Sequence, residues 1–178
     1  MTGPRLTVEL VPSTCWFSNV RSEVSRTDWD TLKRLTSKAA RYRCEVCGGR
    51  GPKWPVECHE VWTYRTGVQQ LVRLIALCPD CHEVKHLGLA ESRGRLQPAL
   101  QHLATINGWA IIDARRYAEA VFELWAQRSN HEWSLDLSYL DRLNIRTSSQ
   151  AGKASPCKGD HPGFDSPLVL HLPKAPAA

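Results

Sequence analysis

Four cysteines in two short pairs are the side chains of this chain best suited to chemistry. Cys44 and Cys47 form one Cys-x-x-Cys pair, and Cys78 and Cys81 form a second pair beyond residues 48–77. Two such pairs can supply the four thiolates of a tetrahedral Zn²⁺ site. Because four thiolates leave no open position for water or substrate, such a site is structural. A redox role for one pair is the alternative, but two pairs in one short segment favour zinc.

Three histidines close to the cysteine pairs form a second candidate metal site. His82 and His86 are four residues apart on a predicted helix, so their imidazoles share one face. His59, on a predicted neighbouring strand, could complete a triad. Three protein ligands would leave positions open for water and a phosphate oxygen, as metal-assisted catalysis requires. The alternative is structural: His82 packs or caps near the zinc, and His86 is a solvated helix residue.

The elements that must position these side chains are two strands and a helix. Branched and aromatic residues predict a strand over 56–64, and an apolar run predicts a second strand over 71–77. We expect a helix to begin at Pro79 and to run to about residue 91, since proline is favoured in a first helical turn. The predicted order is strand, loop, strand and helix, with a cysteine pair at both ends.

The regions on either side of this module predict further elements and place the chain in the α+β class. These elements are a strand over 6–10, a helix capped by Thr27–Asp28, helices over 96–106 and 114–128, and a short element over 135–140. We divide the chain into an N-terminal strand and helix (1–43), the metal-binding module (44–93), C-terminal helices (94–143) and a disordered tail (144–178). In the tail, Cys157, His161 and His171 have no recognisable spacing.

Composition and charge restrict the classes of function without choosing one. The 178 residues include 42% hydrophobic and 23% charged side chains, which is ordinary for a globular protein. The net charge of +5 is compatible with nucleic-acid binding, and an ordinary excess of surface Lys and Arg explains it equally well. Seven cysteines, an odd number, favour metal over disulfides and indicate a reducing, cytoplasmic location. No apolar run reaches the length of a membrane span, so we expect no membrane partner.

The combined motif resembles the HNH endonuclease family. It runs from Cys44-x-x-Cys47 through Glu57-Cys58-His59-Glu60 to Cys78-x-x-Cys81-His82-x-x-x-His86. The resemblance covers residues 44–89, and the opening residues 12–17 resemble a group of bacterial HNH proteins, which suggests a bacterial or phage source. It implies a zinc-stabilised ββα-metal module, a β-hairpin followed by a helix around one divalent ion, embedded among flanking α-helices.

The resemblance assigns a role to each matching position. In colicin-like members, a His-His pair on the first strand supplies a metal ligand and then the general base. On that register His59, His82 and His86 hold the catalytic ion (Mg²⁺, Mn²⁺, Ni²⁺ or Zn²⁺), and Glu60 occupies the general-base position. In the family's other register His59 is the base and Cys58 its ligand partner. We prefer the first register because cysteine is a poor ligand for a hard metal such as Mg²⁺.

Two positions depart from the family motif. Glu60 replaces the usual histidine base, and a free glutamate, with a pKa of about 4.3, is ionised but only weakly basic at neutral pH. Arg73 stands where the family usually has an asparagine, five residues before the third zinc cysteine. That asparagine is understood to hold the loop and the base in place. Both departures bear on activity more than on fold.

The activity that the resemblance implies is metal-dependent hydrolysis of phosphodiester bonds in DNA. Double-stranded DNA is the expected partner, and a homodimer is compatible with cutting both strands. Basic side chains suited to phosphate contact, for which ordinary surface charge is an equal explanation, are Lys85, Arg93, Arg95 and Arg73. The alternatives are a zinc-stabilised nucleic-acid-binding module without catalysis and a protein-interaction domain in which zinc only supports the helices.

Overall fold

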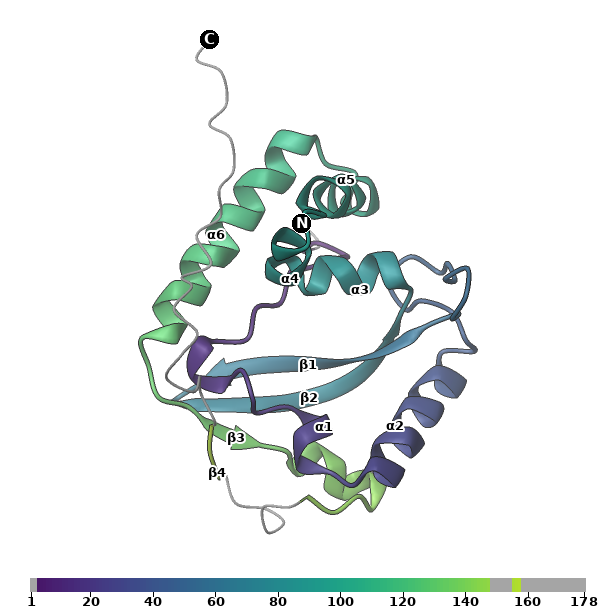
Figure 1. Cartoon of the computed structure of the whole chain (residues 1–178), viewed down its shortest axis with the longest axis vertical. Helices are drawn as coiled ribbons and strands as arrows, with labels where there is room; N and C mark the ends of the chain where they lie inside the picture. The colour runs from purple at the N-terminus through teal and green to yellow at the C-terminus, as the bar shows by residue number, and fades with distance from the viewer. Residues whose placement is uncertain (1–2, 148–154, 158–178) are drawn as a thin grey trace.

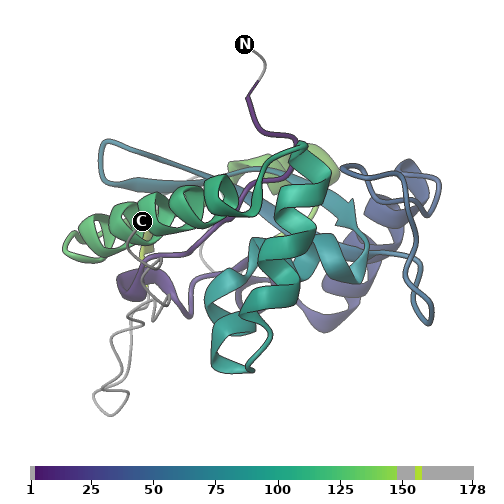
Figure 2. The same ribbon diagram turned by 90° about the horizontal axis from the view of Figure 1, so that it is seen from above.

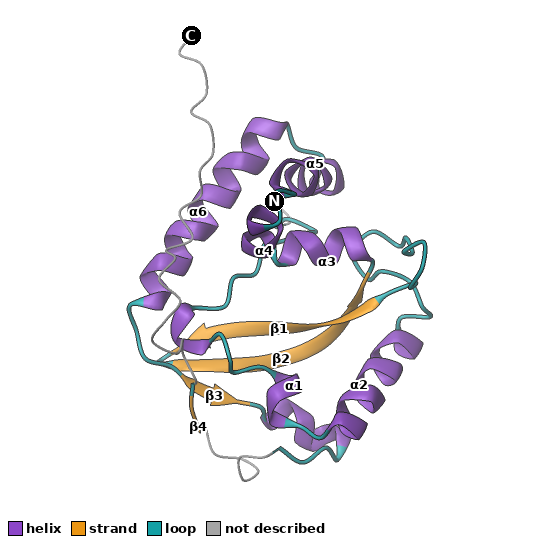
Figure 3. Cartoon of the chain, viewed as in Figure 1, coloured by secondary structure: helices purple, strands orange, loops and turns teal. Residues whose placement is uncertain are grey.

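The described residues of this computed structural model, 3–147 and 155–157, form a mixed α+β fold (Figures 1 and 3). Their α-helices are α1 Val20–Glu23, α2 Arg26–Ala39, α3 Pro79–Lys85, α4 Leu87–Ser92, α5 Leu96–Asn107 and α6 Ile111–Ser129. Their strands are β1 Glu57–Arg65, β2 Val68–Leu77, β3 Ser134–Asp136 and β4 Ser155–Pro156, and two 3-10 helices are η1 Ser13–Cys15 and η2 Ser138–Leu143. The α+β class expected from the sequence is confirmed.

The sheet is built around the hairpin of β1 and β2, the two strands predicted from the sequence. Its strand order is β1-β2-β3-β4, with β1 antiparallel and β3 parallel to β2. The turn residues Thr66 and Gly67 both have positive φ, 50° and 73°, a conformation that suits the twist of a two-residue hairpin. Within the described residues β1 pairs with β2 alone, so β1 forms one edge of the sheet.

Helices cover both faces of the sheet, and each face has its own core (Figure 1). The face under α3, α4 and α5 has a core that includes Ile75, Leu77, Val84, Leu100 and Leu103. The face under α1, α2 and η2 has a core that includes Val20, Leu32, Leu71, Leu74 and Leu140. Side chains that alternate along β1 and β2 therefore contribute to two different environments.

The N-terminal segment, residues 5–11, runs between the helices and is not a strand, so the strand predicted over 6–10 is wrong. Leu6 and Val8 are buried in the core under α3, which explains the alternating pattern. The backbone partners come from helices: the Asn107 side chain bonds both main-chain groups of Leu6, and Glu9 N–H donates to the Lys85 carbonyl. Seen from above in Figure 2, α6 crosses this segment, where Trp125 Nε1 donates to the Val11 carbonyl.

The helix predicted from Pro79 to about residue 91 is divided in the structure. Pro79 opens α3 as predicted, but α3 ends at Lys85 and α4 begins at Leu87. His86 between them has φ −100° and ψ 48°, outside the helical region. The His86 N–H still donates to the His82 carbonyl at 3.2 Å, so the two imidazoles stay on the same side.

The other helix ends follow local signals in the sequence. α2 begins at Arg26, one residue before the predicted cap, because the Ser25 hydroxyl caps it by accepting from Asp28 N–H. α5 stops at the predicted point, where Gly108 takes the left-handed conformation with φ 67°. Among the described helices, none combines the length and apolar content that crossing a membrane demands.

Part of the segment predicted to be a tail is packed on the fold. Ile145 is buried in the core under α1 and α2, and β4 pairs with β3 through Ser155 and Pro156. Cys157 is partly buried against the same core, and its N–H donates to the Trp133 carbonyl. The remaining tail residues, His161 and His171 included, lie outside the described residues.

Candidate metal centres

The two cysteine pairs meet at one end of the hairpin. The sulfurs of Cys44, Cys47, Cys78 and Cys81 all lie within 4.8 Å of one another, and Cys47 Sγ and Cys78 Sγ are 3.6 Å apart. A tetrahedral ion with Zn–S bonds of about 2.3 Å places its sulfurs about 3.8 Å apart. The four side chains therefore fit Zn²⁺ and could bind it.

Backbone donors surround the sulfurs of the first pair. The Cys44 N–H donates to the Gly49 carbonyl and the Gly48 N–H to the Cys44 carbonyl, which closes a tight turn with Gly48 at φ 76°. Within it, Cys47 N–H points at Cys44 Sγ (3.5 Å) and Gly49 N–H at Cys47 Sγ (3.3 Å). Such N–H groups stabilise negative charge on sulfur, which suits the deprotonated thiolates that a metal binds.

Hydrogen bonding within the cluster shifts the pKa values of its thiols in opposite directions. A hydrogen bond from Cys81 lowers the pKa of Cys44 to about 4, with further help from backbone N–H groups. The same contact raises the pKa of Cys81. The cluster thus stabilises a thiolate at Cys44 at neutral pH. His102 of α5 adds a contact not predicted from the sequence, with its Nε2 at 3.2 Å from Cys81 Sγ.

Arg73 ties the first cysteine pair to β2. Its guanidinium donates to Glu45 Oε2 at 3.0 Å, and Glu45 Oε1 accepts from Ala76 N–H at 2.8 Å. A backbone bond from Glu45 N–H to the Ala76 carbonyl runs beside these contacts. These contacts connect β2 to the turn that carries Cys44 and Cys47. The ion pair of Arg73 with Glu45 competes with the phosphate contact predicted for Arg73.

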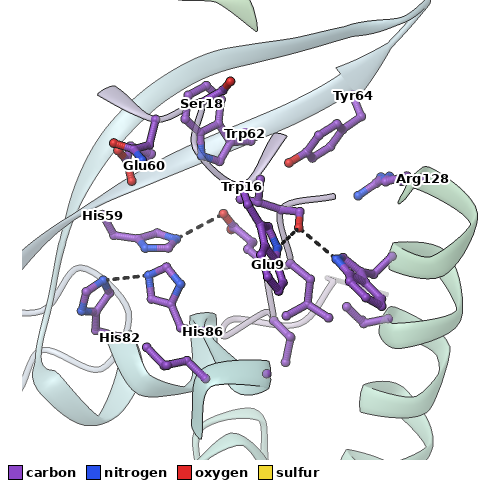
Figure 4. Close-up of a pocket in the computed structure, with 18 of the residues that line it drawn as sticks. Glu9, Trp16, Ser18, His59, Glu60, Trp62, Tyr64, His82, His86 and Arg128 are labelled. Carbon is purple, nitrogen blue, oxygen red and sulfur yellow. Dashed lines mark hydrogen bonds and ion pairs between the residues drawn. The ribbon is translucent and has the colours of Figure 1, made fainter. Parts of the chain in front are cut away.

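The three histidines also converge, between β1 and α3 (Figure 4). One ring nitrogen of each of His59, His82 and His86 lies within 4.8 Å of the others, and His82 Nε2 and His86 Nε2 are 3.1 Å apart. His59 Nδ1 is buried and has no hydrogen-bond partner among the described residues. A buried polar atom without a partner is costly, and coordination to an ion would satisfy it. The set fits a divalent metal with three imidazole ligands.

Two carboxylates bind the outer nitrogens of these rings. Glu9 Oε2 lies 3.3 Å from His59 Nε2, and a Glu57 carboxylate oxygen contacts His82 Nδ1. Carboxylates in these positions fix the tautomer and orientation of metal-binding histidines. Glu9 is itself held by the Lys85 ammonium, which also donates to Thr7 Oγ1. The chain therefore supplies an outer layer of support for two of the three imidazoles.

Burial favours the neutral imidazole at His59 and His86. Burial lowers the pKa of His59, although its hydrogen bond to Glu9 opposes the change. Burial, followed by the neighbouring imidazoles, lowers the pKa of His86 to about 3. Burial alone would raise the pKa of Glu9, but the bonds from His59 and Lys85 outweigh it and lower the pKa. A neutral imidazole at His59 and His86 and an ionised Glu9 carboxylate are the forms that metal binding requires.

Glu60 and Cys58 lie on the other face of β1 from His59. Glu60 Oε1 accepts from Val20 N–H at 3.1 Å, so this carboxylate also holds the start of α1. Burial raises the pKa of Glu60, which makes the carboxylate more basic. The Cys58 sulfur lies 3.6 Å from Thr36 Oγ1, outside the histidine cluster, so the register that made Cys58 a ligand finds no support. The general-base role of Glu60 stays a prediction.

A cavity of about 1050 Å³ joins these groups (Figure 4). It extends along β1, and both His59 and Glu60 line it although they lie on opposite faces of the strand. Aromatic side chains form much of its wall: Trp16, Trp29, Trp62, Tyr64 and Trp125. Since β1 is an edge strand, the two faces communicate along its outer side.

The basic residues predicted to contact phosphate differ in exposure and in their partners. Lys85 is only 4% exposed and bonds Glu9, so it cannot reach DNA, and its predicted contact is wrong. Arg95 is exposed but forms two hydrogen bonds to the Glu83 carboxylate, at 2.6 and 3.0 Å. Arg93 is exposed beside it. The sequence pattern of charges alone gave no sign that the N-terminal segment covers Lys85.

Two supporting residues were missed for different reasons. Glu57 is two positions before His59, and the alternation of a strand puts both on one face, so the sequence carried a signal for it. Glu9 lies fifty residues before His59, in a segment whose path depends on the helices, and no local pattern indicates it.

No protein-family model matches this chain, and the searches of curated proteins and of solved structures likewise found no match. The fold and the sites themselves define its class. It is an α+β protein with a cysteine cluster that could bind zinc and a histidine cluster a short distance along the same hairpin and helix.

Proposed function

We propose that this chain is a metal-dependent endonuclease of the HNH type, which hydrolyses phosphodiester bonds in DNA. The observation that carries the proposal is the convergence of the imidazoles of His59, His82 and His86. His59 Nδ1 is also buried without a hydrogen-bond partner among the described residues. Three neutral ligands leave positions on a divalent ion for water and a phosphate oxygen. The order of β1, β2 and α3, with a closed cysteine cluster at the hairpin end, supports the ββα-metal interpretation.

In this proposal each group of the chain has a separate task. His59, His82 and His86 would hold a divalent ion, which supplies Lewis-acid stabilisation of the charge that develops on the phosphate. Glu9 and Glu57 orient the rings. Glu60, with its raised pKa, takes a proton from the attacking water where the cavity opens along β1.

Replacing Glu60 with glutamine tests the general-base role directly. Glutamine keeps an oxygen that can accept from Val20 N–H, so the start of α1 should remain in place. We expect nicking of supercoiled plasmid to fall about 100-fold or more, the usual contribution of a positioned base. The assay compares wild type and variant across Mg²⁺, Mn²⁺, Ni²⁺ and Zn²⁺.

Two results would count against this assignment. If Glu60→Gln nicks at the wild-type rate, the carboxylate only supports α1. If wild-type protein cleaves neither plasmid nor single-stranded DNA with any of the four ions, the nuclease proposal fails. Glu60→Ala is a useful companion, since it also removes the bond to Val20 and should lower the melting temperature as well as the rate.

Replacing Glu9 with glutamine should weaken binding of the catalytic ion. The change removes the carboxylate from His59 and leaves the buried Lys85 ammonium without its counter-charge. Loss of such an outer partner costs about 10- to 100-fold in metal affinity. Calorimetric titration with Mn²⁺ measures the change. Glu83→Gln, which breaks only the surface contact with Arg95, is the matched control and should bind Mn²⁺ normally.

A further inference from the structure

A second cavity, of about 760 Å³, opens on the other side of His82. Its walls come from α1, α2, the segment before β1 and the start of β1. His82 lines both cavities, so the candidate metal centre stands between them. A strand whose phosphate reached the histidines would therefore have its neighbouring nucleotide within reach of this second space.

An exposed tryptophan is held at the wall of this second cavity. Trp54 is 64% exposed, the largest fraction among the exposed large hydrophobic side chains of the described residues. The loop that carries it is closed by a bond from Gly51 N–H to the Pro55 carbonyl at 3.0 Å. A Cβ on Gly51 would come within 2.2 Å of the Trp54 carbonyl and 2.6 Å of Pro79, so the loop packs too closely for any other residue. A constrained loop thus presents an indole to solvent.

Basic side chains line the same cavity. Arg21, Arg26 and Lys33 approach it from α1 and α2, and two acidic residues, Asp30 and Glu57, also line it. The Glu57 carboxylate is bonded to His82. Lys33 forms an ion pair with Asp30, and the more distant charges of Arg26 and Arg21 also act on that carboxylate. The guanidinium groups of Arg21 and Arg26 have no ion-pair partner in the part of the chain that the structure describes. They are free to bind an anion.

We propose that this cavity binds an unpaired nucleotide next to the phosphate that is cut. The base stacks on Trp54, and Arg21 and Arg26 bind the adjoining phosphate. An aromatic platform beside a positive groove is the arrangement that proteins use for unpaired strands, because every base offers a π-face. The proposal rests on the nuclease function and refines its substrate. Single-stranded or locally opened DNA is the substrate class, in place of the intact duplex that the HNH resemblance implies.

Binding of short DNA without added divalent ion tests this proposal. Fluorescence anisotropy would compare a labelled 12-nucleotide single strand, its duplex, and a duplex with a central mismatch bubble. We expect the single strand and the bubble to bind at least tenfold tighter than the duplex. Trp54→Ala should weaken single-strand binding about tenfold, and Trp54→Phe should restore most of it. Phe17→Ala, an exposed aromatic outside this cavity, is the control.

Salt dependence tests the two arginines separately from the indole. Removing both in Arg21→Ala/Arg26→Ala should reduce the slope of log affinity against log salt by about 0.7, the value for one neutralised phosphate of a single strand. Arg116→Ala, a charge change on the surface of α6, should leave the slope unchanged. An unchanged slope in the double variant would show that Arg21 and Arg26 do not bind a phosphate.

The outcomes separate this site from the nuclease proposal. Equal affinity for duplex and single strand, or wild-type binding by Trp54→Ala, overturns the nucleotide site even if plasmid is nicked. If binding depends on Trp54 but no divalent ion supports cleavage of plasmid, bubble duplex or single strand, the nucleotide site stands and the nuclease proposal fails. Cleavage of the bubble substrate next to its unpaired bases, lost in Trp54→Ala, supports both.

Discussion

Replacing His82 with alanine is expected to abolish metal-dependent nicking of plasmid DNA. His82 supplies the Nε2 that faces His86, and Glu57 holds its other nitrogen, so no neighbouring side chain can replace it. With two imidazoles left, the ion and the charge stabilisation that it provides are lost. We expect the rate to fall about 1000-fold or more, equivalent to about 4 kcal/mol of transition-state stabilisation. Initial nicking rates with Mn²⁺ measure the effect.

The fold should survive this change. His82 is only partly buried, and although it directly follows Cys81 it is not one of the four residues of the cysteine cluster. Zinc content and the circular dichroism spectrum should therefore match wild type. His131→Ala removes an exposed histidine elsewhere and should nick normally. Full activity in His82→Ala would show that the three histidines are not the catalytic centre.

Replacing Cys78 with serine is expected to unfold the module. Cys78 is buried, stands directly after β2 and forms the N-cap of α3, so its sulfur links the hairpin to the helix. Structural zinc sites contribute about 10–16 kcal/mol of binding energy, which matches or exceeds the total stability of most domains. Zinc per chain should fall from one to none, and the cooperative thermal transition should disappear. Elemental analysis and a thermal melt measure these two quantities.

Cys58→Ser provides the comparison within the same segment. The Cys58 thiol packs beside Thr36, and burial raises its pKa to about 11, so it remains a neutral thiol outside the cluster. This variant should keep its zinc and its nicking activity. Retention of one tight zinc and an unchanged melt in Cys78→Ser would contradict the four-cysteine site. Treating wild type with a chelator should reproduce the Cys78→Ser result.

Local patterns in the sequence were sufficient for the hairpin, for most helices and for the two clusters of cysteine and histidine side chains that could bind metal. Strand and helix periodicity depend on neighbouring residues, and Cys-x-x-Cys spacing is fixed by a single turn. The clustering of His59 with His82 and His86 followed because β1, β2 and α3 are consecutive in the chain. Short connections bring consecutive elements together, so these sites were predictable.

The features that the sequence did not predict depend on distant parts of the chain. Glu9 reaches His59 only because the N-terminal segment is held between α5 and α6. The same packing buries Lys85, whose spacing on α3 had suggested an exposed cation. The break at His86 has no glycine or proline to mark it, and we have no local explanation for it. Tertiary contacts determine the position of Glu9 and the burial of Lys85.

The path of the N-terminal segment has a consequence for the order in which the site is completed. Arg5 bonds Asn107, 102 residues away, and Val11 bonds Trp125, 114 residues away. A growing chain that has just released the hairpin and α3 from the ribosome therefore still lacks the surface that places Glu9. Contacts so distant in sequence form late in folding. Residues 5–11 are synthesised before the hairpin but are thus among the last of these elements to take their positions. A nascent chain that ends before α6 therefore carries the three histidines without Glu9 in place.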